Sequence, residues 1–452
     1  MEPKSIAQMR QDAIQIFQAG VQAVEAGQAV RQHCRLDHGR FFVDETGVDL
    51  SKIRNIFVVG AGKATAYMAR AIEDILTDRI TDGRIIIPYG HRDDLRIVFQ
   101  HEAGHPIPDS NGVAGAKDII ELVRRASEPD LVICLISGGG SALTPYPASG
   151  LTLSDKQETI RTLLSCGASI HDINTLRKHL SGYKGGRLAL ESFPAKLMSI
   201  MISDVIGDDP DVIASGPTVP DTTTFADCLQ IIDHHGLINR LPQSVLDHLT
   251  AGAAGKIPET PKPGHPAFEQ ATHHIIASNR QAILASEKQA TALGYDPVIL
   301  SSTIEGETRE IAGMHAAIAR EIHQSGHPVP APACVISGGE TTVHITGQGK
   351  GGRNQEFVLA TVSAIDRIPD TVVLSAGTDG RDGPTDAAGA IADTKTLSRA
   401  ALLGQNPQTF LSDNDAYHFF KPLNDLIPAQ QTRTNVMDLR IILVNPVKEP
   451  LP

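Results

Sequence analysis

Two glycine-rich turns are the parts of this sequence best suited to holding an anion. The first has the sequence VGAGKA and carries Lys63 where an apolar run ends and a helical pattern begins. Free backbone N–H groups at a helix N-terminus, together with the lysine charge, favour an anion there. The turn is neither a Walker A loop nor a complete GxGxxG, because Thr65 stands where the third glycine would be. A tight turn with a solvated lysine therefore remains the alternative.

The second turn, SGGGSA, follows the apolar run LVICLI. Gly138, Gly139 and Gly140 let the backbone approach a bulky phosphate group, and Ser141 can cap the helix or donate a hydrogen bond. Three consecutive glycines cost conformational entropy, which a simple connection does not need. We therefore expect this turn to bind nucleotide phosphates, with a flexible turn as the alternative.

Four basic residues lie in two neighbouring segments, NTLRKH and GYKGGR, of a protein that is acidic overall. They are Arg177, Lys178, Lys184 and Arg187. We expect one or two of them to face a nucleotide or a substrate, and we place Lys184 among the nucleotide-binding residues. The alternative for each is an ordinary solvated charge on a helix.

Carboxylates follow two of the expected strands. Asp204 comes directly after one strand, and Asp379 lies in the loop SAGTDGRDGPTD after another. Such oxygen ligands suit Mg²⁺, and a carboxylate can also accept the proton of a hydroxyl group. We expect Asp204 and Asp379 to do this work, and we leave open which of them binds metal and which acts as base.

The second half of the chain repeats the pattern of a strand followed by glycines. Glu340 follows the string ISGG, and Arg353 and Asn354 begin a helix after the string GKGG. A helix N-terminus with Arg, Asn and Gln is suited to an oxyanion. Glu340 and Asn354 are therefore candidate nucleotide-binding residues, and Arg353 is a candidate catalytic residue.

One string is misleading. Residues 101–105, HEAGH, match the HExxH pattern of zinc proteases, which requires a helix. A strand-like run precedes the string, Gly104 lies inside it, and Pro106 and Pro108 follow it, all of which oppose a helix. A zinc site is therefore not expected, although His105 can still line a site.

The elements that position these residues follow an α/β pattern. Short apolar runs end in Gly- or Ser-rich turns and lead into helical patterns, which is typical of a doubly wound, Rossmann-like domain with ligands at the carboxyl ends of its strands. Strands are expected at residues 53–59, 84–87, 131–136 and 197–202, and in a second set at 274–277, 297–300, 333–336, 371–375 and 439–444.

Length and composition predict two or three domains, since 452 residues correspond to about three domains of ~150 residues. The segment 241–271 is rich in Pro, Gly, Thr and Lys and resembles a linker. We therefore expect an N-terminal domain over residues 1–255, which includes an amphipathic first helix, and a smaller α/β domain over 270–452.

Charge and cysteine content exclude several classes. The formal charge of −12 and the lack of a basic block argue against binding to nucleic acid. Five cysteines without a CxxC pair fit neither a disulfide framework nor a thiolate zinc site. Since no signal peptide and no apolar run of ~18 residues is present, we expect a cytoplasmic protein without membrane contact. The oligomeric state stays open.

Taken together, the motifs resemble one family, the class II glycerate 2-kinases, which join a glycerate-kinase N-terminal domain to a MOFRL C-terminal domain. The matching strings are VGAGKA, EAGHPIPDSNG, ISGGGSAL, LSGYKGGRLA, ISDVIGDDPDVIASGPTVPD, ISGGETTV, GKGGRNQEF and SAGTDGRDGPTDAAGA. The resemblance implies a Rossmann-like domain, a smaller α/β domain, and an active site in the cleft between them. It also implies functional roles for Lys63 and Arg353.

The activity implied by the resemblance is phosphorylation of the 2-hydroxyl of D-glycerate with ATP and Mg²⁺, giving 2-phosphoglycerate and ADP. Two alternatives stay open: an NAD(P)H-dependent hydroxypyruvate reductase, and a sugar-acid-binding regulatory protein without activity. One loop departs from the family pattern TGPTGTNVNDL, because residues 429–439 read AQQTRTNVMDL and lack both glycines and the proline. If this loop touches substrate, its changes affect specificity or rate.

Overall fold

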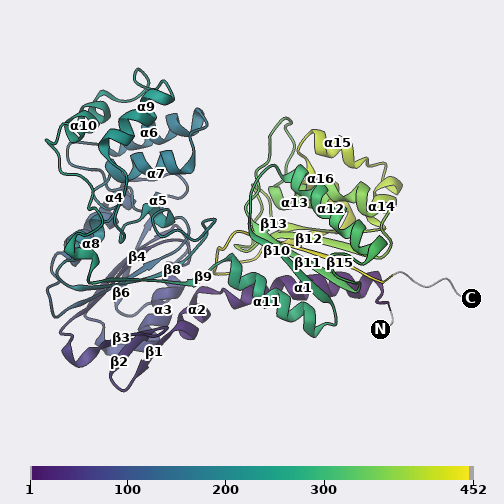
Figure 1. The fold of residues 1–452 in the computed structure, drawn as a ribbon, viewed down its shortest axis with the longest axis horizontal. Helices are drawn as coiled ribbons and strands as arrows, with labels where there is room; N and C mark the ends of the chain where they lie inside the picture. The colour runs from purple at the N-terminus through teal and green to yellow at the C-terminus, as the bar shows by residue number, and fades with distance from the viewer. Residues whose placement is uncertain (1–2, 447–452) are drawn as a thin grey trace, which may run out of the picture. The chain divides into compact units, whose positions relative to one another are not determined.

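The computed structural model describes residues 3–446, which form two compact units. One unit is Ala26–Ile276. The other combines the chain up to Glu25 with the chain from Ala277 onward (Figure 1). The two-domain α/β organisation expected from the sequence is confirmed, but the division of the chain differs at its N-terminus.

The first unit is built on a six-stranded sheet with the order β6-β5-β4-β7-β8-β9. Each pair from β6 to β8 is parallel, as a doubly wound domain requires. The edge strand β9 covers residues that we expected in the second domain. The strands are β4 (Ile56–Ala61), β5 (Asp82–Pro88), β6 (Val98–Ala103), β7 (Leu131–Ile136), β8 (Lys196–Ile202) and β9 (Ala271–Ala277).

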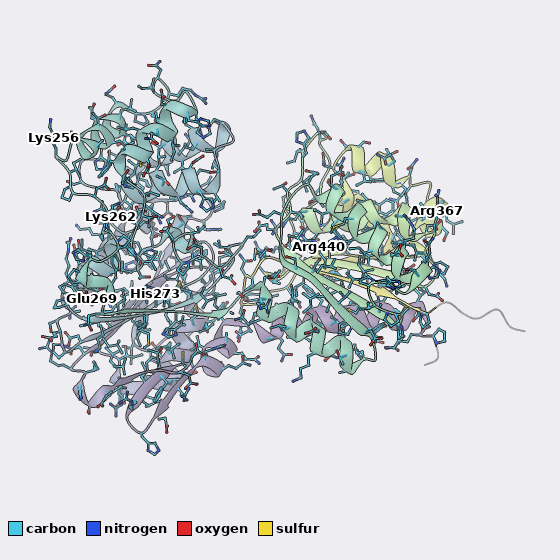
Figure 2. All side chains as sticks on the ribbon, in the orientation of Figure 1. Lys256, Lys262, Glu269, His273, Arg367 and Arg440 are labelled. Atoms are coloured by element: carbon cyan, nitrogen blue, oxygen red, sulfur yellow. The ribbon has the colours of Figure 1, made fainter. Side chains whose placement is uncertain are left out.

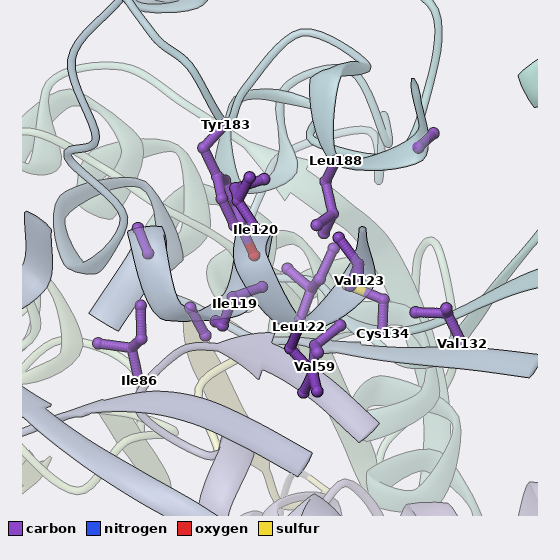
Figure 3. Packing of buried hydrophobic residues seen from close by; sticks show 14 of the residues in the cluster. Val59, Ile86, Ile119, Ile120, Leu122, Val123, Val132, Cys134, Tyr183 and Leu188 are labelled. Atoms are coloured by element: carbon purple, nitrogen blue, oxygen red, sulfur yellow. The ribbon is translucent and has the colours of Figure 1, made fainter. Parts of the chain in front are cut away.

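Apolar side chains from this sheet and its helices form one core (Figure 3). Val59 and Cys134 on adjacent strands pack with Ile119 and Val123 of a covering helix. The unit also contains a small antiparallel sheet. The strands of this small sheet are β1 (Cys34–Asp37), β2 (Arg40–Val43) and β3 (Thr46–Asp49). The helices of this part of the unit are α2 (Ala26–His33), α3 (Thr65–Leu76), α4 (Ser110–Val123), α5 (Gly140–Leu143) and α8 (Arg187–Ser192).

Four further helices of the first unit share a separate apolar core, which includes Leu163, Leu176, Phe225 and Leu249. They are α6 (Leu153–Ser165), α7 (Ile170–His179), α9 (Phe225–His234) and α10 (Gln243–Ala253). Helix α10 lies within the segment 241–271 that resembles a linker. That interpretation was wrong for this part, because the apolar residues of α10 recur at helical spacing and pack into the core.

The second unit is built on a mixed sheet with the order β10-β11-β15-β12-β13-β14. Only β10 and β11 are a parallel pair, whereas β15 runs antiparallel to both of its neighbours. The C-terminal strand therefore lies inside the sheet. The strands are β10 (Asp296–Ile304), β11 (Ala333–Gly339), β12 (Thr371–Gly377), β13 (Ala387–Asp393), β14 (Leu426–Pro428) and β15 (Asp438–Val444).

Helix α1 (Ile6–Ala23) belongs to this second unit, although it comes first in the chain. It packs on α11 (Asn279–Ala292), where Ser286 Oγ donates to the carbonyl of Ile16 at 3.1 Å. The guanidinium of Arg10 forms ion pairs with Asp393 and Asp425, both at 2.6 Å. These contacts join segments that are far apart in sequence, which an amphipathic pattern does not identify.

The remaining helices of the second unit pack on its sheet around a core that includes Phe357, Val362 and Phe419. They are α12 (Thr308–Ser325), α13 (Arg353–Ile365), α14 (Thr396–Leu402), α15 (Pro407–Ser412) and α16 (Ala416–Phe420). Within residues 3–446, none of the helices combines the length and the apolar character that crossing a membrane requires.

Candidate functional site

Lys63 lies in a turn between β4 and α3, at the edge of the first sheet. Gly62 has φ +150°, and a Cβ atom there would lie 2.1 Å from Ser137 Oγ. Glycine is therefore required for the close approach of this turn to the next one. The N–H of Lys63 donates to the carbonyl of Gly138 at 2.9 Å, and the N–H of Ala64 donates to Ser137 Oγ at 3.0 Å.

These hydrogen bonds correct one expectation. We expected free N–H groups around Lys63, but those of Lys63 and Ala64 are taken by the neighbouring turn, and that of Gly62 donates to the carbonyl of Ile86 at 3.1 Å. The backbone here positions the turn and does not offer donors to an anion. An anion bound at this turn would therefore interact with the side chain of Lys63 and not with these N–H groups.

The glycine turn, residues 137–141, follows β7 and is held in a left-handed conformation at Gly139, where φ is +85°. Among the residues that the structure describes, the N–H groups of Gly138 and Gly139 have no hydrogen-bond acceptor. A Cβ atom at Gly139 would lie 2.9 Å from the ring of His105 and 3.4 Å from Cγ of Lys63. The turn therefore brings backbone donors, a lysine and a histidine together, as an oxyanion site requires.

His105 also belongs to this group, although the sequence indicated only that it could line a site. Burial lowers the pKa of His105 to about 4, and the charges of Lys63 and His91 contribute in the same direction. Its imidazole is therefore neutral near neutral pH and can accept a proton or a hydrogen bond. The HExxH reading is excluded by the fold, because residues 98–103 form strand β6.

Lys184 is hydrogen-bonded to the glycine turn and to the helix that follows it. Its Nζ donates to the carbonyl of Ser141 at 2.8 Å and to Thr144 Oγ1 at 2.9 Å, and the residue is 2% exposed. Ser141 Oγ also contacts Ser215 Oγ at 2.8 Å. Lys184 thus contacts the glycine turn, a contact that the sequence did not predict, while its predicted contact with a nucleotide stays a prediction.

The other basic residues of the same segment differ from one another. Lys178 forms ion pairs with Asp211 and with Asp221, the latter at 3.4 Å, so its charge is used inside the protein. Asp211, in the loop after β8, is thereby held by a buried lysine. Arg177 instead donates to the amide oxygen of Asn174 at 3.3 Å.

Asp204 follows β8 and is half-buried. Strands β4, β7 and β8 are parallel neighbours, so Lys63, the glycine turn and Asp204 all lie at the carboxyl edge of one sheet. This is where a doubly wound sheet binds its ligands. The arrangement suits an anionic ligand that is held by Lys63 and the backbone, with a carboxylate nearby.

The candidate residues of the second unit meet around Asp438, at the start of β15. In the antiparallel registers, Asp438 is opposite Gly339 at the end of β11 and Gly377 at the end of β12. Arg353 donates to both carboxylate oxygens of Asp438, at 2.7 and 3.1 Å, and to Glu340 at 2.6 Å. The guanidinium that we expected to face a ligand is thus paired with two carboxylates.

The N-terminus of α13 is occupied by the protein's own carboxylate. Asp382 accepts hydrogen bonds from the N–H groups of Asn354 at 3.0 Å and Gln355 at 2.9 Å. The helix N-terminus thus binds an oxyanion, as its composition indicates, but that oxyanion is a side chain. Burial raises the pKa of Asp382 to about 6, against the hydrogen bonds, which act in the opposite direction.

The remaining predicted residues take separate positions. Asn354 donates to Asp438 at 2.9 Å and is buried, whereas Glu340 is largely exposed. Asp379 is half-buried and accepts the N–H of Arg381 at 3.1 Å. Asp204 and Asp379 belong to different units, and within residues 3–446 no three His, Cys, Asp or Glu side chains form a metal-binding group.

Asp438, Asp382 and Arg440 are the charged residues of the second unit whose importance sequence reasoning missed. Arg440 on β15 is 1% exposed (labelled in Figure 2), and its Nη2 lies 3.5 Å from Asp438. A signal for Asp438 existed, since it is the carboxylate of the string TNVMDL that we compared with a family loop. Its role as the partner of Arg353 depends on the antiparallel register, which the sequence does not show.

Comparisons with known proteins agree with this architecture. Two family models match: "Domain of unknown function (DUF4147)" over residues 12–250 and "MOFRL family" over residues 333–438. The chain is 37% identical to the D-glycerate 2-kinase of Thermotoga maritima, covering 98% of this chain and 99% of that protein. It is 42% identical to a putative hydroxypyruvate reductase of Agrobacterium vitis, covering 86% of each.

A solved structure shows the same fold. The crystal structure of glycerate kinase from Thermotoga maritima superposes with a TM-score of 0.86 at 36% identity, covering 97% of this chain and 100% of that chain. Both units of the present chain therefore have counterparts in that protein.

Proposed function

Because this chain belongs to the family that joins a DUF4147 domain to a MOFRL domain, the architecture of the class II glycerate kinases, we propose that it is a glycerate 2-kinase. It transfers the terminal phosphoryl group of ATP to the 2-hydroxyl of D-glycerate, giving 2-phosphoglycerate and ADP. The observation that carries the proposal is the similarity to the Thermotoga D-glycerate 2-kinase over 98% of the chain.

The residues at the sheet edge of the first unit suit this chemistry. Phosphoryl transfer depends on positioning and on neutralising negative charge. In the proposal, the N–H groups of Gly138 and Gly139 bind phosphate oxygens and Lys63 neutralises the transferring group. The close packing of the Lys63 turn against the glycine turn supports this assignment, because it keeps both sets of donors in a fixed relation.

The second unit contributes Arg353, Asn354 and Glu340 in the proposal. Arg353 acts on the phosphoryl group or on the glycerate carboxylate through a guanidinium whose orientation is set by Asp438. Because this guanidinium is already paired with Asp438 and Glu340, a reactant can engage Arg353 only by competing with these carboxylates or by adding to the pairs. Asp438 is therefore a positioning residue for Arg353.

Mg²⁺ is proposed as the cofactor, held by Asp204 or by Asp379. Mg²⁺ in kinases is bound through one or two carboxylates, substrate phosphates and water, so two half-buried carboxylates in loops after strands fit it. When bound, it neutralises phosphate charge. The carboxylate that does not bind metal, or the neutral imidazole of His105, accepts the proton of the glycerate hydroxyl.

A cytoplasmic location is part of the proposal. All five cysteines are free thiols in the structure, four of them buried, as expected for a protein of a reducing compartment that supplies ATP. The ligands are small molecules, and the net charge of −12 makes a nucleic acid an unsuitable partner.

One coupled assay tests the activity. The protein is incubated with D-glycerate, ATP and Mg²⁺ in the presence of enolase and without a mutase, and we expect phosphoenolpyruvate to form. Formation of 3-phosphoglycerate alone would contradict the regiochemistry. Consumption of NADH with hydroxypyruvate, without use of ATP, would favour the activity in the name of the Agrobacterium relative. No turnover in either assay would favour a binding protein.

A further inference from the structure

Three basic side chains of the first unit lie near one another, and one of them, Lys184, contacts the glycine turn. Lys156 comes from α6, Arg177 from the last turn of α7, and Lys184 from the loop before α8. The Nζ of Lys156 donates to the carbonyl of Tyr146 at 3.3 Å, and this carbonyl also accepts the N–H of Gly182 at 3.1 Å. Lys156 is thus held against the loop that carries Lys184.

A chain of hydrogen bonds connects this group to the glycine turn. Lys184 Nζ donates to the carbonyl of Ser141. Ser141 Oγ contacts Ser215 Oγ, Ser215 donates to Asn174 at 3.1 Å, and Arg177 donates to the same amide oxygen. Lys184 and Arg177 are therefore part of the same hydrogen-bond network as the proposed phosphate-binding turn.

None of these three cations has a carboxylate partner. In the part of the chain that the structure describes, no carboxylate oxygen lies within 4.0 Å of a charged nitrogen of Lys156, Arg177 or Lys184. Lys156 is 6% exposed and Lys184 2% exposed, so water does not replace the missing partner. Lys178, the residue after Arg177, shows the ordinary arrangement, with two aspartates on its ammonium group.

The isolation of these charges is energetically unfavourable. Burial lowers the pKa of Lys156 to about 7, and repulsion by Arg177 and Arg187 adds to this effect. Burial also lowers the pKa of Lys184 well below its usual value, with Lys156 and Arg177 contributing. Nearby, Nε of Arg187 is buried without a hydrogen-bond acceptor in the described structure. Buried charges in proteins are normally paired, because removing an unpaired charge from water is energetically costly.

We infer that Lys156, Arg177 and Lys184 form an oxyanion-binding site whose counter-charge is supplied by a reactant, either a phosphate of the nucleotide or the carboxylate of glycerate. The inference rests on the proposed function, because it takes the ligand from that reaction. Its position beside Ser141 extends the anion site from the backbone donors of the glycine turn to three side chains. Lys156 would then be a binding residue that none of the sequence motifs includes.

The test replaces Lys156 by methionine, which keeps the length of the side chain and removes the charge. Binding of inorganic phosphate, ADP and D-glycerate to the full chain is measured separately by calorimetry. For at least one of the three, we expect Lys156→Met to weaken binding by about tenfold to a hundredfold, the effect of losing a hydrogen bond to a charged group. The control is Arg161→Met, which removes an exposed charge from the same helix and should leave binding unchanged.

The melting temperature separates binding from a structural role. Without ligand, Lys156→Met should be at least as stable as the wild type, since it removes an unpaired buried charge. Calorimetry in two buffers of different ionisation enthalpy adds a second readout, the number of protons taken up on binding. An anion favours the charged form of Lys156, so we expect the wild type to take up more protons than the variant. Arg177→Met serves as the second variant if Lys156→Met does not fold.

The outcomes identify the ligand or overturn the site. Weaker binding of ADP alone assigns the cations to the nucleotide, and weaker binding of glycerate alone assigns them to the carboxylate. Unchanged binding of all three ligands, or a lower melting temperature with unchanged binding, overturns the inference. If the wild type is an active kinase and Lys156→Met leaves binding unchanged, this site is rejected and the proposed function is kept. If phosphate binding depends on Lys156 but the wild type shows no kinase turnover, the site is kept and the proposed function is rejected.

Discussion

The two candidate sites, one in each unit, differ in how their basic side chains are paired. In the first unit, Lys156 and Lys184 are buried without a carboxylate partner in the described structure. In the second unit, Arg353 shares Asp438 with the fully buried Arg440 and also pairs with Glu340. Lys184 contacts the turn after β7 and Arg353 contacts the start of β15, and ligands of α/β proteins bind at such strand ends, so position alone does not explain the difference.

The difference indicates two tasks. A cation that is paired inside the protein has its orientation fixed before a ligand arrives, and its charge is largely balanced. A buried cation without a partner gains most when an anion binds. We therefore expect the first unit to supply most of the anion affinity, and the second unit to supply an oriented guanidinium.

We expect Lys63→Met, in the candidate site of the first unit, to impair catalysis most strongly. Removing a charge that stabilises the transferring phosphoryl group should lower kcat/KM by about 10³-fold or more. Steady-state kinetics in the enolase-coupled assay would measure it. The control is Lys117→Met, which removes an exposed lysine that pairs with exposed Glu121. Near-normal activity of Lys63→Met would show that Lys63 does not act on the reactants.

The next effect breaks the pairing of the second unit. Asp438→Asn leaves buried Arg440 without its carboxylate and weakens the bidentate contact with Arg353. Loss of one partner of a buried ion pair should lower the free energy of unfolding by about 3–5 kcal/mol. Urea denaturation of variant and wild type, side by side, would measure this loss.

The matched control uses the other carboxylate on the same guanidinium. Glu340 is 44% exposed in its side chain, against 0% for Asp438. Glu340→Gln should therefore change the free energy of unfolding by no more than about 1 kcal/mol. Equal losses in the two variants would mean that burial does not distinguish the pairs, and the contrast between the units would lose its basis.

Sequence reasoning identified the elements that depend on local patterns. The strand predicted at 131–136 coincides with β7, and those at 197–202 and 439–444 each lack only the first residue of β8 and β15. Sheet membership was harder to predict, because it depends on contacts between distant segments. An apolar run does not show that 274–277 joins the first sheet, or that β15 lies between β11 and β12.

The candidate site shows the same limit. Glycine turns carry a local signal, so the positions of Lys63 and Gly139 at strand ends were predictable. The partners of Arg353 and of the α13 N-terminus come from residues 85 and 28 positions away, and their pairing requires the fold. A local signal for Lys156 did exist, since it interrupts the apolar face formed by Leu153, Ile160 and Leu163. A lysine on the buried face of a helix indicates either an ion pair or a ligand.

The last prediction concerns the pH dependence of the charged residues around Asp382 in the second unit. Burial raises the pKa of Asp382 from 3.8 to about 6, with nearby Asp438 contributing through repulsion. Between these values the folded state holds more protons than the unfolded state, so this carboxyl group makes folding less favourable as the pH rises. Its contribution is fully favourable below about pH 4 and declines until about pH 6, by at most about 3 kcal/mol.

Asp382→Asn isolates this contribution, because an amide does not titrate. The quantity to follow is the difference in unfolding free energy between variant and wild type, from about pH 4 to about pH 7. We expect the variant to gain on the wild type as the pH rises, even though it loses one acceptor for the N–H groups of Asn354 and Gln355. A difference that stays constant across this range would mean that the α13 N-terminus already compensates the charge of Asp382. Keeping Asp382 charged would then not reduce the stability of the second unit. Its charged residues would be fully compensated inside the protein, in contrast to Lys156 and Lys184 of the first unit.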